Sequence, residues 1–357
     1  MKILQLVSSL GIGGAEKFVV DISIALQRQG NNVDIVVLDR AEDIGKSNSY
    51  EQLMIDKLIC SGVSVNFMKS GRKNLLRSYL NLYQLVNKIK PDVIHSHLLI
   101  WSLLLSFLPK QYKVIFTQHT NRLKLAIMHK YWLRYRIDHY ISICDEVNKV
   151  CLQLCGQSRV TKVINGIDFT SIKPKDKILI DSKKNKHKFI NVARLEPEKN
   201  ISLLIKASHF LIGKGLDFQV IIVGDGSLIE NLKKEVLDLN LTETVTFLGA
   251  RNDVPELLYS SDSFVLTSFY EGFSISLIEA LATGLNVIAT DVGGNGELLQ
   301  HGKFGQLILS DDVLSLSNAM ENSINNLSYS NNREERDLYL EQLSVESCAK
   351  KHVQIYS

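Results

Sequence analysis

The chain has 357 residues, of which 45% are hydrophobic and 22% are charged, and its formal net charge at pH 7 is +3. This composition is that of an ordinary globular protein with enough apolar residues for a sizeable core, and the length suggests two domains. No apolar run reaches the roughly 18 residues that a membrane-spanning helix needs. The five cysteines show neither a disulfide framework nor the spacing of a metal site, so we expect buried, reduced thiols.

The first half of the chain alternates strand-like and helical segments. The apolar runs KILQLVSS (2–9) and NVDIVVLD (32–39) flank a helical segment (15–30) that ends on Gly30, a typical C-terminal cap. We expect the first run to belong to the fold, because a signal peptide would have a longer apolar region. Three more strand-like runs follow, PDVIHSH (91–97), KVIFTQHT (113–120) and DHYISIC (138–144). Such alternation predicts a mostly parallel sheet with helices on both faces.

The same pattern restarts after a polar, lysine-rich stretch at 173–188. Its strand-like runs are KFINVARL, FQVIIVGDG, VTFLG, SFVLTSFYEG and NVIATDVGG. The predicted fold class is therefore α/β, with two doubly wound, Rossmann-like domains that face each other across a cleft. The predicted boundaries are an N-terminal domain at 1–170 that binds an acceptor, a linker at 171–188, a C-terminal domain at 189–335, and a helical tail at 336–357 that could pack back on the N-terminal domain.

Glycines and cations stand where strands are predicted to end. In GIGGAEK (11–17), Gly13 and Gly14 would let backbone N–H groups approach a ligand at a helix N-terminus, although a tight turn explains them equally well. In NVARLEPEKN (191–200), Arg194 and Lys199 enter a loop before a helix. A guanidinium binds a diphosphate through two hydrogen bonds and an ammonium binds as a point charge, so this pair predicts a diphosphate site.

Three histidines also fall at predicted strand ends, namely His95, His97 and His119. For His95 we favour a hydrogen-bonded position in the core. His119 is the better candidate for a polar contact at a reacting centre.

The segment SFYEGFSISLIEALATG (268–284) holds two carboxylates among small and apolar residues. Glu271 is predicted in the turn after a strand, the helix is predicted to begin near Ser274, and Glu279 lies two turns along it at the edge of the packed face. Ionised carboxylates accept pairs of hydroxyls, so one can bind a sugar and the other a ribose. The open N–H groups at the helix start suit a phosphate, and they belong to Ser274, Ile275 and Ser276.

With these motifs in this order, the chain resembles the retaining glycosyltransferases of family 4, which have the GT-B fold. The resemblance runs from about residue 1 to 306. It rests on E-x7-E (Glu271 and Glu279), GGAEK, HSH, NGID, R…EK, VGDG, and VGG before Glu297. It implies an enzyme of the kind found in bacterial polysaccharide synthesis. That enzyme moves a sugar from a nucleotide-diphosphate sugar, most commonly a UDP-sugar, to a glycan acceptor.

The resemblance also implies roles for the cationic pair and the carboxylates. Arg194 and Lys199 would bind the donor diphosphate and replace a metal, so we expect no metal and no other cofactor. Glu271 would contact the donor sugar, and Glu279 would hold the ribose hydroxyls. The sugar would be transferred with retention by front-face attack, with the leaving phosphate as the base.

Further roles are implied around the donor. Gly13 and Gly14 would approach its phosphates or sugar, His119 would lie beside the sugar, and the nucleobase would lie near Arg251. The chain departs from the family pattern at Cys144, in the sequence Gly-Leu-Asn at 284–286, and in GGNGE at 293–297. These departures leave the identity of the sugar open.

Basic residues are concentrated in the N-terminal half. Residues 57–137 contain fourteen Lys or Arg and one acidic residue, which gives this segment a net charge of +13 and leaves −10 for the rest. Within it, RLKLAIMHKYWLRYR (122–136) places apolar residues on one helical arc opposite basic ones. This suits a helix on an anionic membrane surface, although an ordinary packed helix with a basic outer face is the alternative. We expect a lipid-linked acceptor, such as a polyprenyl-diphosphate sugar, and a cytoplasmic enzyme peripheral on the inner face of the membrane.

Two other functions are compatible with parts of the sequence. A nucleotide-sugar epimerase on the same fold would need no acceptor, and product analysis with the donor alone would identify it. A non-catalytic protein could instead bind nucleic acid or a membrane through the basic segment. We do not expect nucleic acid as a partner, because no nucleic-acid-binding motif accompanies the charge, and filter binding at physiological salt would test this.

Overall fold

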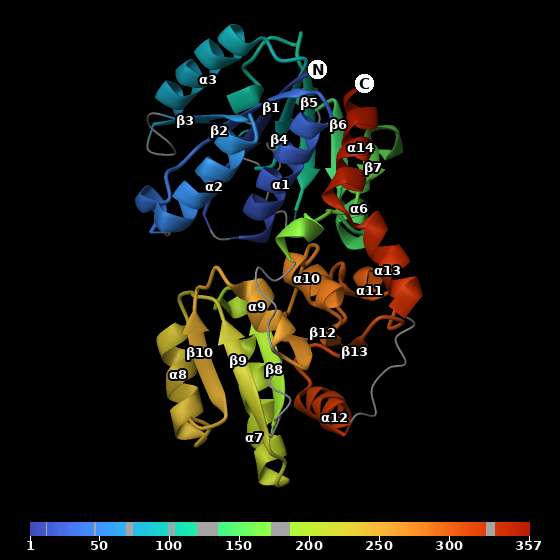
Figure 1. The fold of residues 1–357 in the computed structure, drawn as a ribbon. Helices are drawn as coiled ribbons and strands as arrows, with labels where there is room; N and C mark the ends of the chain where they lie inside the picture. Colours follow the sequence, from blue (N-terminus) through green and yellow to red (C-terminus); the bar gives the residue numbers. More distant parts are fainter. Residues whose placement is uncertain are drawn as a thin grey trace. The chain divides into compact units, whose positions relative to one another are not determined.

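A computed structural model of the chain describes residues 1–11, 13–45, 48–68, 74–98, 101, 104–119, 135–172, 186–325 and 333–357. These residues form two compact units. The first comprises Met1–Asp168 and Gln342–Ser357, and the second comprises Phe169–Glu341. Each unit contains a parallel sheet with helices packed on it, as the sequence predicts (Figure 1).

In the described part of the first unit, seven parallel strands have the order β3-β2-β1-β4-β5-β6-β7. They are β1 (Lys2–Val7), β2 (Asn32–Val37), β3 (Ser64–Phe67), β4 (Val93–Ser96), β5 (Lys113–Gln118), β6 (His139–Ser142) and β7 (Val160–Lys162). The strand order reverses between β1 and β4. Successive side chains of a strand point to opposite faces, so β1 sends Ile3 and Val7 into one apolar core and Leu4 and Leu6 into the other.

The helices in the described part of the first unit divide between these two cores. They are α1 (Gly14–Arg28), α2 (Asn48–Cys60), α3 (Leu75–Ile89), α6 (Asp145–Cys155) and α14 (Val345–Tyr356). Helices α1, α2 and α14 supply the core that contains Ile3, and α3 and α6 supply the core that contains Leu4. Helix α14 lies against α1 although more than 300 residues separate them in sequence (Figure 1).

The segment before α14 is fixed by the NGID motif. Ile167 N donates to Leu343 O and Val345 N donates to Ile167 O, both at 2.9 Å. A Cβ on Gly166 would lie only 2.4 Å from Ser344 O, so this glycine allows two backbones to approach closely. The motif therefore attaches the end of the chain to the first unit.

In the described part of the second unit, six parallel strands have the order β10-β9-β8-β11-β12-β13. They are β8 (His187–Val192), β9 (Phe218–Val223), β10 (Val245–Gly249), β11 (Ser263–Leu266), β12 (Asn286–Thr290) and β13 (Gln306–Ile308). The helices are α7 (Ile201–Gly213), α8 (Ile229–Asp238), α9 (Val254–Tyr259), α10 (Ile275–Thr283), α11 (Asn295–Leu298), α12 (Val313–Ile324) and α13 (Arg333–Gln342). Here the strand order reverses between β8 and β11.

The structure differs from the sequence-based boundaries at two places. Strand β8 begins at His187, inside the predicted linker, because Lys188 N donates to Asp262 Oδ2 at 2.9 Å and His187 Nε2 lies 2.9 Å from Ser263 Oγ. Most of that linker (173–185) lies outside the described residues. The predicted tail at 336–357 is not one element, since most of α13 belongs to the second unit and α14 to the first.

Among the described residues, no helix is both long enough and apolar enough to span a bilayer. Nearly all of the basic segment predicted as an interfacial helix (122–136) lies outside the described residues.

Candidate functional site

The two polar clusters of the second unit leave the sheet at neighbouring strands. The loop with Arg194 and Lys199 follows β8, and the loop with Glu271 follows β11. These strands pair with each other at the point where the strand order reverses. Ligands of open α/β sheets bind beyond the carboxyl ends of the strands at such a point. The fold therefore brings together residues that are about 70 positions apart in sequence.

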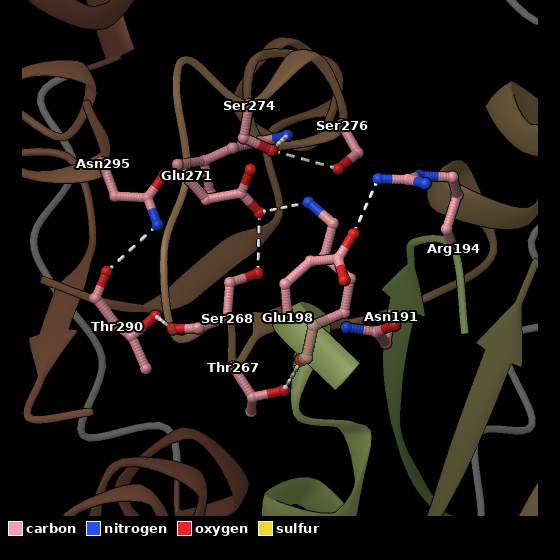
Figure 2. Close-up of polar contacts among 12 residues, drawn as sticks. Asn191, Arg194, Glu198, Thr267, Ser268, Glu271, Ser274, Ser276, Thr290 and Asn295 are labelled. Atoms are coloured by element: carbon pink, nitrogen blue, oxygen red, sulfur yellow. Dashed lines mark hydrogen bonds and ion pairs between the residues drawn. The ribbon is translucent and has the colours of Figure 1, made fainter. Parts of the chain in front are cut away.

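Lys199 and Glu271 form the centre of this site. Lys199 Nζ donates to Glu271 Oε1 at 2.6 Å, and Ser268 Oγ donates to the same oxygen at 2.6 Å (Figure 2). The side chains of Lys199 and Glu271 are 16% and 8% exposed. Because this pair is largely removed from water, its attraction is screened less than that of a surface ion pair.

Arg194 has a different partner. Its NH2 group donates to Glu198 Oε1 at 2.8 Å, and its side chain is 53% exposed (Figure 2). Phe269 N donates to the backbone oxygen of Glu198 at 2.8 Å, which ties the two loops together. Lys199 is thus paired with Glu271 inside the site, whereas Arg194 lies at its exposed rim. An exposed ion pair such as that of Arg194 with Glu198 contributes little stability.

Helix α10 begins where the sequence predicts. Ser274 is its N-cap, and the Ser274 Oγ accepts from Leu277 N at 3.4 Å and lies 3.2 Å from Ser276 Oγ. The first N–H groups of a helix have no partner within the helix, so the positions from Ser274 to Ser276 can receive an anion. Glu279 lies further along α10 and is 8% exposed, so it is more buried than its predicted place at the edge of the packed face.

Two glycines let the loops of the site pack backbone against backbone. Gly293 has a φ of +58°, and a Cβ there would lie 1.9 Å from Glu271 O. Gly224 has a φ of +137°, and a Cβ there would lie 1.8 Å from Ala193 O. Only glycine adopts such angles readily and leaves room for the neighbouring backbone. The VGG and VGDG motifs therefore hold the loops that carry Glu271 and Arg194.

Several hydroxyl groups of the site were missed by the sequence analysis. Besides Ser268, Thr267 Oγ1 donates to Lys199 O at 3.0 Å and Thr290 Oγ1 donates to Ser268 O at 2.7 Å (Figure 2). Thr267 and Ser268 directly follow β11 in the run SFVLTS, so their position at a strand end could have been noticed. Their hydrogen-bond partners could not have been predicted, because those partners lie on other elements.

Arg251 is not brought to the Lys199–Glu271 pair by any contact among the described residues. It follows β10, which β9 separates from β8. Its guanidinium binds both carboxylate oxygens of Asp253 and is 44% exposed. Its position near a nucleobase therefore stays a prediction.

The first unit holds the remaining candidates. Gly14 begins α1, and Gly13 precedes it with an extended φ of 177° that any residue adopts. His119 directly follows β5 and is partly exposed. Its Nε2 lies 3.0 Å from His97 Nδ1, and burial lowers the pKa of His119 to about 4. His95 is fully buried and hydrogen-bonded, which confirms the core position predicted for it.

Within the described residues, no group of three or more His, Cys, Asp and Glu side chains could hold a metal ion. Metal independence stays a prediction.

Two family models match the chain, one on each half. The model described as "Glycosyltransferase Family 4" matches residues 12–171, and the model described as "Glycosyl transferases group 1" matches residues 173–337. The boundary between the two matches falls close to the boundary between the two structural units.

Curated relatives and solved structures agree with these matches. The UDP-Gal:alpha-D-GlcNAc-diphosphoundecaprenol alpha-1,3-galactosyltransferase of Escherichia coli is 32% identical over 273 residues, which cover 69% of each chain. A Campylobacter jejuni N-acetylgalactosaminyltransferase, named for a diphospho-undecaprenol-linked sugar, is 38% identical over 133 residues, or 37% of this chain and 36% of the relative. The structure of Anabaena HepE in complex with UDP-glucose superimposes with a TM-score of 0.84 at 20% identity and covers 99% of both chains, which shows a shared fold.

Proposed function

Because the chain belongs to the family 4 glycosyltransferases, we propose that its second unit binds a nucleotide-diphosphate sugar and that the sugar passes with retention to a glycan acceptor. The observation that carries this proposal is the meeting of Lys199, Glu271 and the start of α10 at the reversal of the second sheet. A cation, a carboxylate and a helix N-terminus are the groups that a diphosphate and sugar hydroxyls require.

The proposal gives each group one part of the donor. The N–H groups at Ser274, Ile275 and Ser276 bind the diphosphate from the helix end. Lys199 and Arg194 neutralise its charge, and Arg194 leaves Glu198 to do so. Glu271 accepts hydrogen bonds from hydroxyls of the sugar, and Glu279 accepts them from the ribose. In the first unit, His119 contacts the sugar, and the backbone at Gly13 and Gly14 approaches it. In the second unit, Arg251 lies near the base.

The chemistry follows from where charge develops. The bond between the anomeric carbon and the diphosphate oxygen breaks, and the acceptor oxygen bonds to the same face of that carbon. The acceptor proton passes to the departing phosphate oxygen. Lys199, Arg194 and the positive end of α10 stabilise the negative charge on the leaving group, so no metal ion is needed.

The names of the relatives support a donor and an acceptor class. The Escherichia coli relative is named for UDP-Gal and for a sugar on diphosphoundecaprenol, and HepE was solved with UDP-glucose. We therefore propose a UDP-sugar donor and a polyprenyl-diphosphate-linked acceptor, as in the synthesis of a cell-surface polysaccharide.

Donor binding can be tested by thermal stabilisation. UDP-sugars, other nucleotide sugars and free nucleotides are added to the wild type in EDTA. A ligand at one hundred times its Kd should stabilise the native state by about 2.7 kcal/mol, a shift of several degrees. We expect the shift with a UDP-sugar and without metal. Glu279→Ala should lose most of it, and Glu230→Ala, which removes an exposed carboxylate of α8, should keep it. No shift, or a shift only with added divalent metal, would contradict the proposed site.

A membrane surface is the last partner in this proposal, and an exposed apolar patch on the first unit supports it. On α3, Leu76 and Leu80 are 71% and 51% exposed, and Phe107, whose ring contacts Tyr79, is 57% exposed. Arg77 stands among them and is exposed. Apolar side chains beside cations are what a peripheral protein presents to an anionic membrane. The enzyme would then meet its lipid-linked acceptor on the cytoplasmic face.

Flotation with vesicles tests this surface. The wild type should float with vesicles that contain an anionic phospholipid at low salt, and less with zwitterionic vesicles. The double variant Leu76→Ser/Leu80→Ser should bind at least about tenfold more weakly, because two buried leucines contribute more than 1.4 kcal/mol. The matched control is Leu237→Ser/Leu314→Ser, which changes leucines of the second unit that are 63% and 57% exposed. Equal losses in the two variants, or no binding by the wild type, would rule the surface out.

A further inference from the structure

Five polar side chains lie on one face of the first sheet, where the pattern of the strands would place apolar ones. Along β1, β4 and β5, the residues Ile3, Val93 and Ile115 face the core that contains α1 and α14. Side chains two positions apart share a face. The same face therefore carries the side chains of Gln5, His95, His97, Thr117 and His119.

Hydrogen bonds link these groups to Tyr356 of α14, which is 3% exposed. The Tyr356 hydroxyl lies 2.6 Å from His95 Nδ1 and 3.5 Å from Gln5 Nε2. His95 Nε2 lies 2.7 Å from Thr117 Oγ1. On the other side, Gln5 Oε1 lies 2.8 Å from His97 Nε2, and His97 Nδ1 lies 3.0 Å from His119 Nε2. A continuous chain thus runs from α14 to His119.

The direction of this chain follows from its shortest link. A distance of 2.6 Å is typical of an O–H donor rather than of an N–H donor, so Tyr356 donates its proton to His95 Nδ1. Its oxygen can then accept from Gln5 Nε2, which turns Gln5 Oε1 towards His97. An amide oxygen only accepts, so His97 carries its proton on Nε2. His97 Nδ1 is then an acceptor, and His119 must carry its proton on Nε2.

Desolvation favours the neutral form of both imidazoles. It lowers the pKa of His97 well below its usual value and the pKa of His119 to about 4. The ring of Phe18 on α1 lies edge-on to both, with centroids 6.3 Å from His97 and 5.9 Å from His119. In a neutral imidazole that is protonated on Nε2, Nδ1 is a hydrogen-bond acceptor.

We propose that Tyr356 is a positioning residue that acts through Gln5 and His97 to fix the tautomer of His119, so that His119 offers Nδ1 as an acceptor to a hydroxyl of the donor sugar. This inference rests on the proposed contact of His119 with the donor. Lys113 Nζ donates to the backbone oxygen of Tyr356 at 3.1 Å and holds the end of α14 in place. The C-terminal helix thereby acts on the site of the first unit without touching substrate.

The tautomer can be measured without any activity. In ¹⁵N-histidine-labelled full-length protein at neutral pH, His119 and His97 should each show a protonated Nε2 and an unprotonated Nδ1. Their signals are assigned with His119→Gln and His97→Gln. Tyr356→Phe frees Gln5 to turn over, so both tautomers of His119 should then be populated. The control Tyr140→Phe removes a buried hydroxyl that has no partner among the described residues, and it should leave the spectrum unchanged.

A kinetic cycle separates positioning from general stability. Tyr356→Phe should lower kcat about fivefold, the size of one lost hydrogen bond, while Tyr140→Phe should not change it. In a His119→Ala background the same Tyr356→Phe change should have no further effect on kcat. Any fall in melting temperature caused by Tyr356→Phe should persist in that background, because packing does not depend on the imidazole.

The outcomes are distinguishable. A His119 protonated on Nδ1 in the wild type, or an equal fall in kcat with and without His119, would overturn the role of Tyr356. The expected tautomers together with full activity of His119→Ala would instead overturn the contact between His119 and the donor, and with it the functional half of this inference. If the donor does not stabilise the wild type at all, that result would contradict the donor site of the second unit and the proposed function itself.

Discussion

Replacing Lys199 by methionine is expected to lower the turnover of the proposed transfer by about a hundredfold to a thousandfold. That is the usual loss when one group that stabilises developing negative charge is removed. Lys199 Nζ lies at the centre of the site, 2.6 Å from Glu271 Oε1, and is 16% exposed. Its charge therefore acts with little screening on a leaving diphosphate at the start of α10. Methionine keeps the apolar stem and removes only the ammonium.

The loss should fall mainly on kcat rather than on KM, because the diphosphate gains negative charge as the sugar leaves it. Lys199→Arg should restore little, since a planar guanidinium cannot take the place of a compact ammonium 2.6 Å from a buried carboxylate. Among the described residues, loss of the cation leaves the Glu271 carboxylate with Ser268 as its remaining side-chain donor, so stability should fall by about 1–3 kcal/mol.

Lys303→Met is the matched control for this experiment. Lys303 also pairs with a glutamate of the second unit, Glu335, at 3.0 Å, but both side chains are about half exposed. Its replacement should change stability by less than about 1 kcal/mol and leave turnover unchanged. If Lys199→Met retained more than about a tenth of the wild-type turnover, Lys199 would not be the group that stabilises the leaving diphosphate.

The sequence was sufficient for those parts of the site that depend on local order. Alternating strands and helices predicted both parallel sheets. Strand ends placed Lys199 and Glu271 at one edge of the second sheet, and the predicted helix start near Ser274 is the start of α10. These features depend on hydrophobic periodicity and capping, which act over a few residues.

The sequence was not sufficient for contacts that depend on the path of the chain. Arg194 and Lys199 looked equivalent as cations on one loop. A 3-10 helix lies at Pro197–Lys199, and Lys199 at its end contacts Glu271, while Arg194 contacts Glu198, four residues later in the same loop. The contact of Tyr356 with Gln5 joins residues 351 positions apart. The sequence also did not show that the helical tail is shared between the two units. An amphipathic pattern predicts which face of a helix is buried, but not which element that face packs against.

Gly293→Ala should destabilise the protein by about 2–4 kcal/mol and lower turnover together with stability. An alanine at a φ of +58° is strained by about 1–2 kcal/mol. Its Cβ would also lie 1.9 Å from Glu271 O, so one of the two backbones must move, at a further cost of about 1–2 kcal/mol. Because the atom it meets belongs to Glu271, that movement displaces the carboxylate from Lys199. Calorimetry should show a melting temperature lower by about 6–12 °C.

Gly215→Ala separates backbone strain from this close approach. Gly215 follows α7 with a φ of +81°, and nothing lies within 4 Å of the position that its Cβ would take. Alanine there has the left-handed strain alone, so it should cost only about 1–2 kcal/mol and leave turnover unchanged. Equal losses of stability in the two variants would mean that the backbone of Glu271, which faces Gly293, moves away at little cost. In that case the VGG motif would not hold Glu271 in place, and the glycine would serve only the turn.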